Sequence, residues 1–142
     1  MVKTTLVGAD IEHGGELLSR IEERDKTSRQ GFRIQAAFWL RENESLAWTL
    51  VIASPLIDEI GPLRAYRAVQ TVVRPMKLED FTLEDVSVVS PGDPLVRAIR
   101  KVRFLPGSTG MKLGPGTIGR EFVEGVYIYR LRSKAKKQKK AS

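Results

Sequence analysis

The sequence holds very few side chains of the kinds that act as nucleophiles, bases or metal ligands. Its 142 residues include no cysteine and a single histidine, His13. A thiolate nucleophile, a disulfide framework and a cysteine- or histidine-rich metal site are therefore excluded. His13 is the one imidazole that could serve as a general base, and no motif pairs it with a serine. We interpret it as a polar residue in the first turn of a helix, and predict no catalytic residue, no metal and no cofactor.

Two further stretches invite a chemical interpretation. Asp58 and Glu59 follow an apolar run and precede a predicted helix, so they could hold Mg²⁺ through water. Acids are also favoured at that position by the helix dipole alone. The glycine-rich residues 107–119 lack the G-x-x-x-x-G-K-[ST] spacing of a phosphate loop, although a backbone nest followed by Lys112 could receive an anion. We interpret the two stretches as a helix start and a loop.

The strongest chemical signal is positive charge near the C-terminus. The net charge is +7; residues 130–142 carry seven bases and no acid, whereas residues 1–129 hold 17 bases and 17 acids. Such a concentration of charge predicts electrostatic contact with a nucleic-acid backbone. The residues expected to make this contact are Arg97, Arg100, Lys101, Arg103, Arg130, Arg132, Lys134, Lys136, Lys137, Lys139 and Lys140.

A second hypothesis rests on Trp39, which lies between Arg33 and Arg41 on the strand face predicted to point away from the core. An exposed tryptophan could stack on a base or anchor a protein partner. Coverage by the C-terminal segment is the alternative. The composition thus favours a small non-enzymatic accessory module that contacts nucleic acid through its basic C-terminal part. The alternative is a protein-binding adaptor subunit of a larger bacterial complex, and an enzyme ranks third.

The elements that position these residues are organised around a predicted β-hairpin over residues 31–54. Apolar and polar residues alternate there with a period of two, as in a strand with one buried face. A three-residue loop of Asn43, Glu44 and Ser45 keeps both apolar sets on that face, because a one-residue slip would reverse every side chain. The predicted pairs are Leu40 with Trp48, Phe38 with Leu50 and Ala36 with Ile52.

Start signals predict three helices. Asp10 is a candidate N-cap for a helix that ends near Asp25, Pro62 stands at the first position of a second helix, and Asp93-Pro94 begins a third. Residues 86–89 and 120–131 have the β-branched and aromatic composition of strands. Glycine and proline rule out regular structure over most of residues 106–119.

The resulting order, αββαβαβ, predicts a two-layer α+β domain with a mostly antiparallel sheet covered on one face by helices. If residues 2–7 form a strand, the order becomes that of a ferredoxin-like fold. We expect a single domain over residues 1–132 and a disordered lysine-rich tail over residues 133–142. No signal-peptide core or bilayer-spanning apolar run is present, which predicts a cytoplasmic protein with no membrane partner.

Three stretches together resemble a family of small bacterial proteins that share a domain of unknown function. They are AAFWLRENESLAWTLVIASPLIDEIGPLRAYRAVQ, DVSVVSPGDPLVRAIRK and the closing GVYIYRLR. The resemblance covers about residues 10–132, and it implies no activity, cofactor or site residue. The N-terminal arm and the lysine-rich tail lie outside it.

Overall fold

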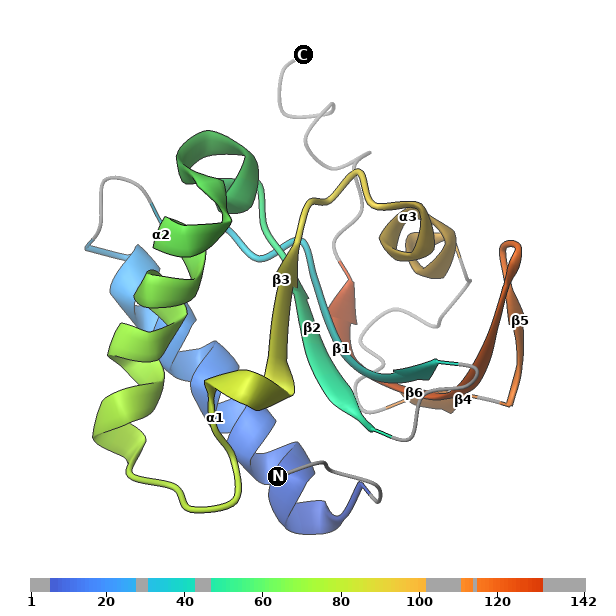
Figure 1. Ribbon diagram of the computed structural model, residues 1–142, viewed down its shortest axis with the longest axis horizontal. Coiled ribbons are helices and arrows are strands. Elements are labelled where there is room, and N and C mark those ends of the chain that lie inside the picture. Colours follow the sequence, from blue (N-terminus) through green and yellow to red (C-terminus); the bar gives the residue numbers. More distant parts are fainter. Residues whose placement is uncertain (1–5, 28–30, 43–46, 102–110, 114, 132–142) are drawn as a thin grey trace.

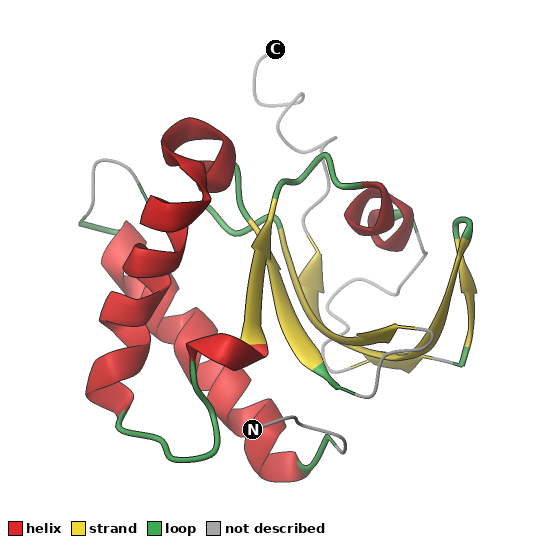
Figure 2. Cartoon of the chain, in the orientation of Figure 1, coloured by secondary structure: helices red, strands yellow, loops and turns green. Residues whose placement is uncertain are grey.

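A mixed β-sheet forms the middle of the molecule (Figure 1 and Figure 2). The computed structural model describes residues 6–27, 31–42, 47–101, 111–113 and 115–131. Within these residues the helices are α1 (Gly8–Asp25), α2 (Leu56–Val73) and α3 (Pro94–Arg100), with single 3-10 turns η1 (Arg74–Met76) and η2 (Leu83–Asp85). The strands are β1 (Ala36–Glu42), β2 (Thr49–Ala53), β3 (Val86–Val89), β4 (Met111–Leu113), β5 (Gly116–Ile118) and β6 (Glu121–Leu131).

The strands lie in the order β3-β2-β1-β6-β4, and β5 pairs with β6. Only β2 and β3 run parallel; the other neighbours are antiparallel. A parallel pair requires a crossover connection, and α2 lies within that connection. The predicted α+β class and the mostly antiparallel sheet are confirmed, and the predicted order αββαβαβ holds apart from two additional short strands, β4 and β5.

Both faces of the central hairpin are buried. Trp39, Leu50 and Ile52 pack in one apolar core with residues of α1 and α2, whereas Phe38 and Val51 pack in a second core with residues of α3. Figure 1 shows α1 and α2 on one side of the sheet and α3 on the other. The helical layer of α1 and α2 agrees with the prediction. The placement of α3 on the same face as these two helices was wrong.

The predicted register of the hairpin was also wrong by one residue. Phe38 pairs with Val51 and Leu40 with Thr49, so Phe38 and Leu50 point to opposite faces. The prediction assumed that one face of the hairpin is exposed to solvent. It therefore used the loop length that places the large apolar residues of both strands on the opposite, buried face. Because both faces are apolar in the folded chain, alternation places no constraint on the register.

The helix starts depend on local hydrogen bonds and backbone geometry. Asp93 caps α3 as predicted, since its Oδ1 accepts from the amides of Leu95 and Val96 at 2.9 and 3.3 Å. Pro62 follows Gly61, whose φ of 87° kinks α2, so the regular part of α2 does begin at Pro62. The residues before Gly61 make an additional helical turn that starts at Leu56.

The remaining differences lie at the two ends of the chain. The first helix begins at Gly8, and Asp10 is its third residue instead of its cap; Asp10 Oδ2 accepts from the amide of Val7 at 3.0 Å. Leu6 and Val7 are not in a strand, and residues 1–5 lie outside the described residues, as does the predicted tail over 133–142. The short strands β4 and β5 lie in the glycine-rich stretch that was expected to be irregular.

A buried hydrogen-bonded chain fixes α1 on the sheet. Trp39 Nε1 donates to the hydroxyl of Tyr129 at 2.9 Å, and that hydroxyl donates to the carbonyl of Ile11. A Cβ at Gly14 would lie 2.5 Å from the Tyr129 hydroxyl and 3.0 Å from Trp39 Nε1. The helix can reach this position only because residue 14 has no side chain.

Replacing Gly14 with alanine should lower the free energy of unfolding by about 1–3 kcal/mol, the range for overpacking a filled site. The adjacent Gly15→Ala is a matched control, because a Cβ there would lie at an ordinary 3.6 Å from Tyr129 Cε1. It should leave stability unchanged or raise it by up to about 1 kcal/mol through helix propensity. Urea unfolding of both variants measures the difference, and equal stabilities would contradict the close approach of α1.

The buried hydrogen bonds of Tyr129 also predict a loss of stability at alkaline pH. Burial raises the pKa of the Tyr129 phenol above its ordinary value, and its hydrogen bond from Trp39 offsets part of that rise. In the unfolded chain the phenol ionises near pH 10. The contribution of Tyr129 to the free energy of unfolding is therefore fully present below about pH 10 and decreases as the pH rises further. Tyr129→Phe should therefore be less stable at pH 8 but lose less stability between about pH 10 and 11. The measurement is the free energy of unfolding from urea titrations at each pH. If it decreased equally with pH in the wild type and in Tyr129→Phe, Tyr129 would not be the cause of the alkaline loss.

Candidate functional site

The acidic and imidazole side chains do not form a catalytic cluster. His13 Nδ1 makes no hydrogen bond within the described residues, and Asp80 Oδ1 lies 3.9 Å away, beyond hydrogen-bond reach. Asp58 accepts a hydrogen bond from Ser90 Oγ at 2.8 Å, whereas Glu59 pairs with Arg33 at 2.6 Å. The two adjacent carboxylates thus have separate partners. In the described part of the chain, no three His, Asp or Glu side chains converge as a metal site.

The residues proposed for a protein partner do not form one exposed surface. Trp39 is fully buried and Arg41 is partly buried, whereas Arg33 is exposed. The expectation that Trp39 faces solvent was wrong, because α1 covers this side of β1. Tyr129, from the C-terminal strand, also contacts the indole, so coverage by the C-terminal segment was correct in part.

Two of the basic residues predicted at α3 are exposed. Val96 and Ile99 face the second core, whereas Arg97 and Lys101 are exposed and Arg100 is partly buried. Burial lowers the pKa of Arg100 below its ordinary value, yet a guanidinium remains charged at neutral pH. Among the described residues, neither Arg97 nor Lys101 forms an ion pair. Both cations are therefore available to an anionic ligand.

The turn between β5 and β6 packs directly against α3. Gly119 adopts a φ of 65°, and a Cβ at this position would lie 2.8 Å from the Cβ of Ala98. The close contact leaves an open groove of about 360 Å³, hereafter the basic groove. The groove is lined by Pro94, Arg97, Ala98, Lys101 and Gly119.

Sequence reasoning missed the contribution of this turn. Arg120 follows Gly119 and is exposed, so the turn brings a further cation next to the basic groove. Its place in the sequence, between a glycine-rich stretch and a strand, gave no signal that it would approach α3. Of the other predicted contacts, Arg130 lies in β6 opposite Ala37. Arg103 and the basic residues from Arg132 to Lys140 lie outside the described residues.

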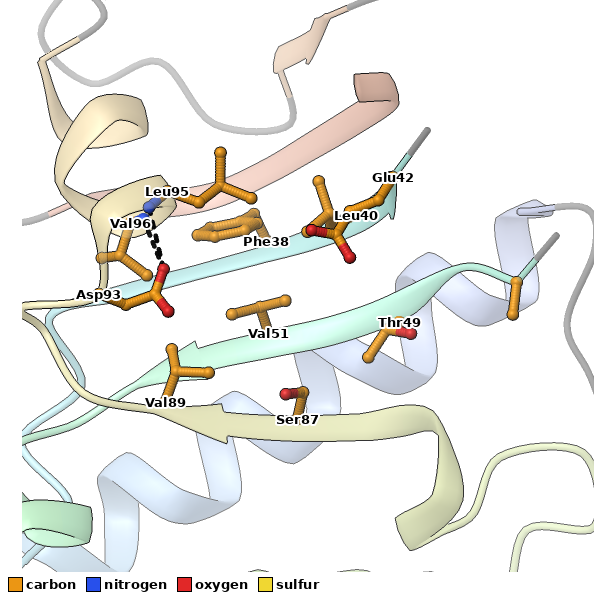
Figure 3. Close-up of a pocket in the computed structure, with 11 residues that line it drawn as sticks. Phe38, Leu40, Glu42, Thr49, Val51, Ser87, Val89, Asp93, Leu95 and Val96 are labelled. Atoms are coloured by element: carbon orange, nitrogen blue, oxygen red, sulfur yellow. Dashed lines mark hydrogen bonds between the residues drawn. The ribbon is translucent and has the colours of Figure 1, made fainter. Parts of the chain in front are cut away.

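A second hollow lies on the inner side of α3, over the sheet. This pocket, of about 240 Å³, is open between the helix start and strands β1, β2 and β3 (Figure 3). Its described lining includes the acids Glu42 and Asp93 and no base. The seven-residue helix therefore separates a basic groove from an acidic pocket.

Comparison with models of protein families, with curated proteins and with solved structures finds no match for this chain. The resemblance to a bacterial family stays a prediction. None of the helices in the described residues combines the length and the apolarity that a membrane crossing requires.

Because Asp93 determines where α3 begins, it also controls the geometry of both hollows. Asp93→Ala removes the acceptor for two amides and should lower the free energy of unfolding by about 1 kcal/mol. Asp93→Asn retains a side-chain oxygen and should change stability by a few tenths of that value at most. Thermal and urea unfolding compare the two variants. An equal loss of stability in both would show that the side-chain cap at Asp93 does not stabilise α3.

Proposed function

We propose that the protein binds a nucleic-acid backbone through the basic groove of α3. The supporting observation is that Arg97 and Lys101, one helical turn apart, stand exposed at the rim of a groove of about 360 Å³. Arginine and lysine are the usual partners of phosphate oxygens, arginine as a fork and lysine as a point charge. The charge excess of the C-terminal residues adds to the same interaction.

The shape of the basic groove suits a phosphodiester chain. Besides the two cations, Pro94, Ala98 and Gly119 line the groove, and these compact residues leave room for a backbone to approach the helix. The two cations are four residues apart, about 6 Å along the helix axis, and lie on the same side. Side chains four residues apart on a helix are neighbours, so both cations can reach the phosphates of one ligand in the groove.

Contact through this groove should be insensitive to base sequence. None of the described groove-lining residues is aromatic. The exposed Phe122 pairs with Thr117, whereas the neighbouring Ile118 and Val123 face the second core. Because successive side chains of a strand alternate, Phe122 points away from α3. Phosphate contacts position a protein on nucleic acid without reading bases, so we expect nonspecific binding.

The adaptor alternative has less support, because its anchor residue Trp39 is buried. A partner would have to bind through Arg33, which is paired with Glu59, and the partly buried Arg41. The electrostatic hypothesis needs no rearrangement of this kind. The basic groove is therefore the preferred binding surface.

The salt dependence of binding tests this function. The double variant Arg97→Gln/Lys101→Gln should reduce the slope of log affinity against log salt by about 0.9 for each duplex phosphate that is no longer neutralised, or about 1.8 in total. Removing residues 133–142 deletes five lysines and should reduce the slope further. Fluorescence anisotropy with random duplex and single strands between about 50 and 200 mM salt measures the slopes.

A variant that removes the same charge elsewhere provides the control. Arg64→Gln/Arg67→Gln removes two exposed cations from α2, on the other side of the sheet. It should change the slope much less than the groove variant. Equal effects of the two double variants would mean that only total charge matters. Undetectable binding by the wild type at about 50 mM salt would exclude the function.

A further inference from the structure

The acidic pocket lies beside α3, on a part of the sheet that this short helix does not cover. The helix packs Val96 and Ile99 onto the second core, but it extends for only seven residues. Among the described residues, a pocket of about 240 Å³ is open next to it. Pockets for drug-sized ligands begin at about 300 Å³, so the occupant must be small. The lining residues are Phe38, Leu40, Glu42, Ala47, Thr49, Val51, Ser87, Val89, Asp93, Leu95 and Val96.

The two carboxylates of the pocket stand at its opposite ends. Figure 3 shows Asp93 at the end next to α3 and Glu42 at the far end, with Phe38, Leu40 and Val51 between them. The middle of the pocket therefore offers apolar contact, and each end carries one negative charge. A cleft lined by one sign of charge attracts ligands of the other sign.

Each end has acceptors available for a cationic donor. Asp93 uses only Oδ1 to cap α3; within the described residues its Oδ2 accepts no hydrogen bond. Glu42 is exposed, and its side chain makes no hydrogen bond or ion pair with another described residue. The hydroxyl-bearing Thr49 and Ser87 line the same pocket. An ammonium group has three donors, which this combination of carboxylate and hydroxyl oxygens can accept.

We propose that this pocket binds an aliphatic diamine, a chain of methylene groups with an ammonium group at each end. The methylene chain would lie against Phe38, Leu40 and Val51, and the two ammonium groups would pair with Glu42 and Asp93. A monoamine satisfies one carboxylate only, and an anionic ligand is repelled by both. The proposal does not depend on nucleic-acid binding, because the pocket and the basic groove lie on different sides of α3.

Isothermal titration of the full chain, purified free of nucleic acid, tests the proposal directly. The probes are the α,ω-diaminoalkanes with two to eight carbons, the 1-aminoalkanes and the α,ω-diols of equal length. Affinity should rise to a maximum at one diamine length and fall on either side. The matching monoamine should bind about fivefold more weakly, as expected for the loss of one partly exposed ion pair, and the diol weaker still. Absence of saturable binding of every diamine up to about 10 mM would overturn the proposal.

Isosteric variants show whether the two carboxylates are responsible. Glu42→Gln and Asp93→Asn should each weaken diamine binding about fivefold and abolish the advantage over the monoamine. Glu124→Gln removes an exposed acid that does not line the pocket, and it should bind diamines as the wild type does. If Asp93→Asn fails to fold, Glu42→Gln still tests the site, because Glu42 is exposed and its replacement should not affect folding. Unchanged affinity in Glu42→Gln, or an equal loss in Glu124→Gln, would refute the site.

Discussion

The burial of β1 and β2 on both faces is the constraint on which the rest of the fold depends. Phe38 and Trp39 are neighbours in the chain, point to opposite faces and are both fully buried. A strand pair of this kind needs cover on each side, because an exposed face of large apolar residues would be unstable in water. The helices α1 and α2 supply it on one side, and α3 with the β5–β6 hairpin supplies it on the other (Figure 1).

The helices on the two faces differ in length: α1 and α2 have 18 residues each, and α3 has seven. The candidate sites lie beside the short helix. On the first face α1 lies so close to the sheet that a Cβ at Gly14 would lie 2.5 Å from the Tyr129 hydroxyl. The hollow between α1 and α2 on this face has a volume of about 70 Å³. On the second face the described residues leave a pocket between α3 and the sheet, and a groove between α3 and the β5–β6 turn. The acids of the pocket and the bases of the groove give these hollows opposite charge, and hence ligands of opposite charge.

Local signals in the sequence predicted most of the fold. The Asp93-Pro94 start, the Pro62 start and the composition of residues 86–89 and 120–131 all depend on near neighbours, and each element formed as expected. The predicted hairpin register was wrong because the prediction assumed that one face of the hairpin is exposed to solvent. The basic residues of α3 were predicted from charge alone. The approach of Arg120 and the opposition of Glu42 and Asp93 were not, because they arise from packing between segments far apart in the chain.

The most direct test of the account is to measure how much stability each face of β1 contributes. Phe38→Ala and Trp39→Ala truncate adjacent residues that face different cores. Two-sided burial predicts a loss of about 3–5 kcal/mol in the free energy of unfolding for each variant, measured by urea titration. A strand with one exposed face would lose stability in only one of them. A change below about 1 kcal/mol for either substitution would therefore contradict the central claim.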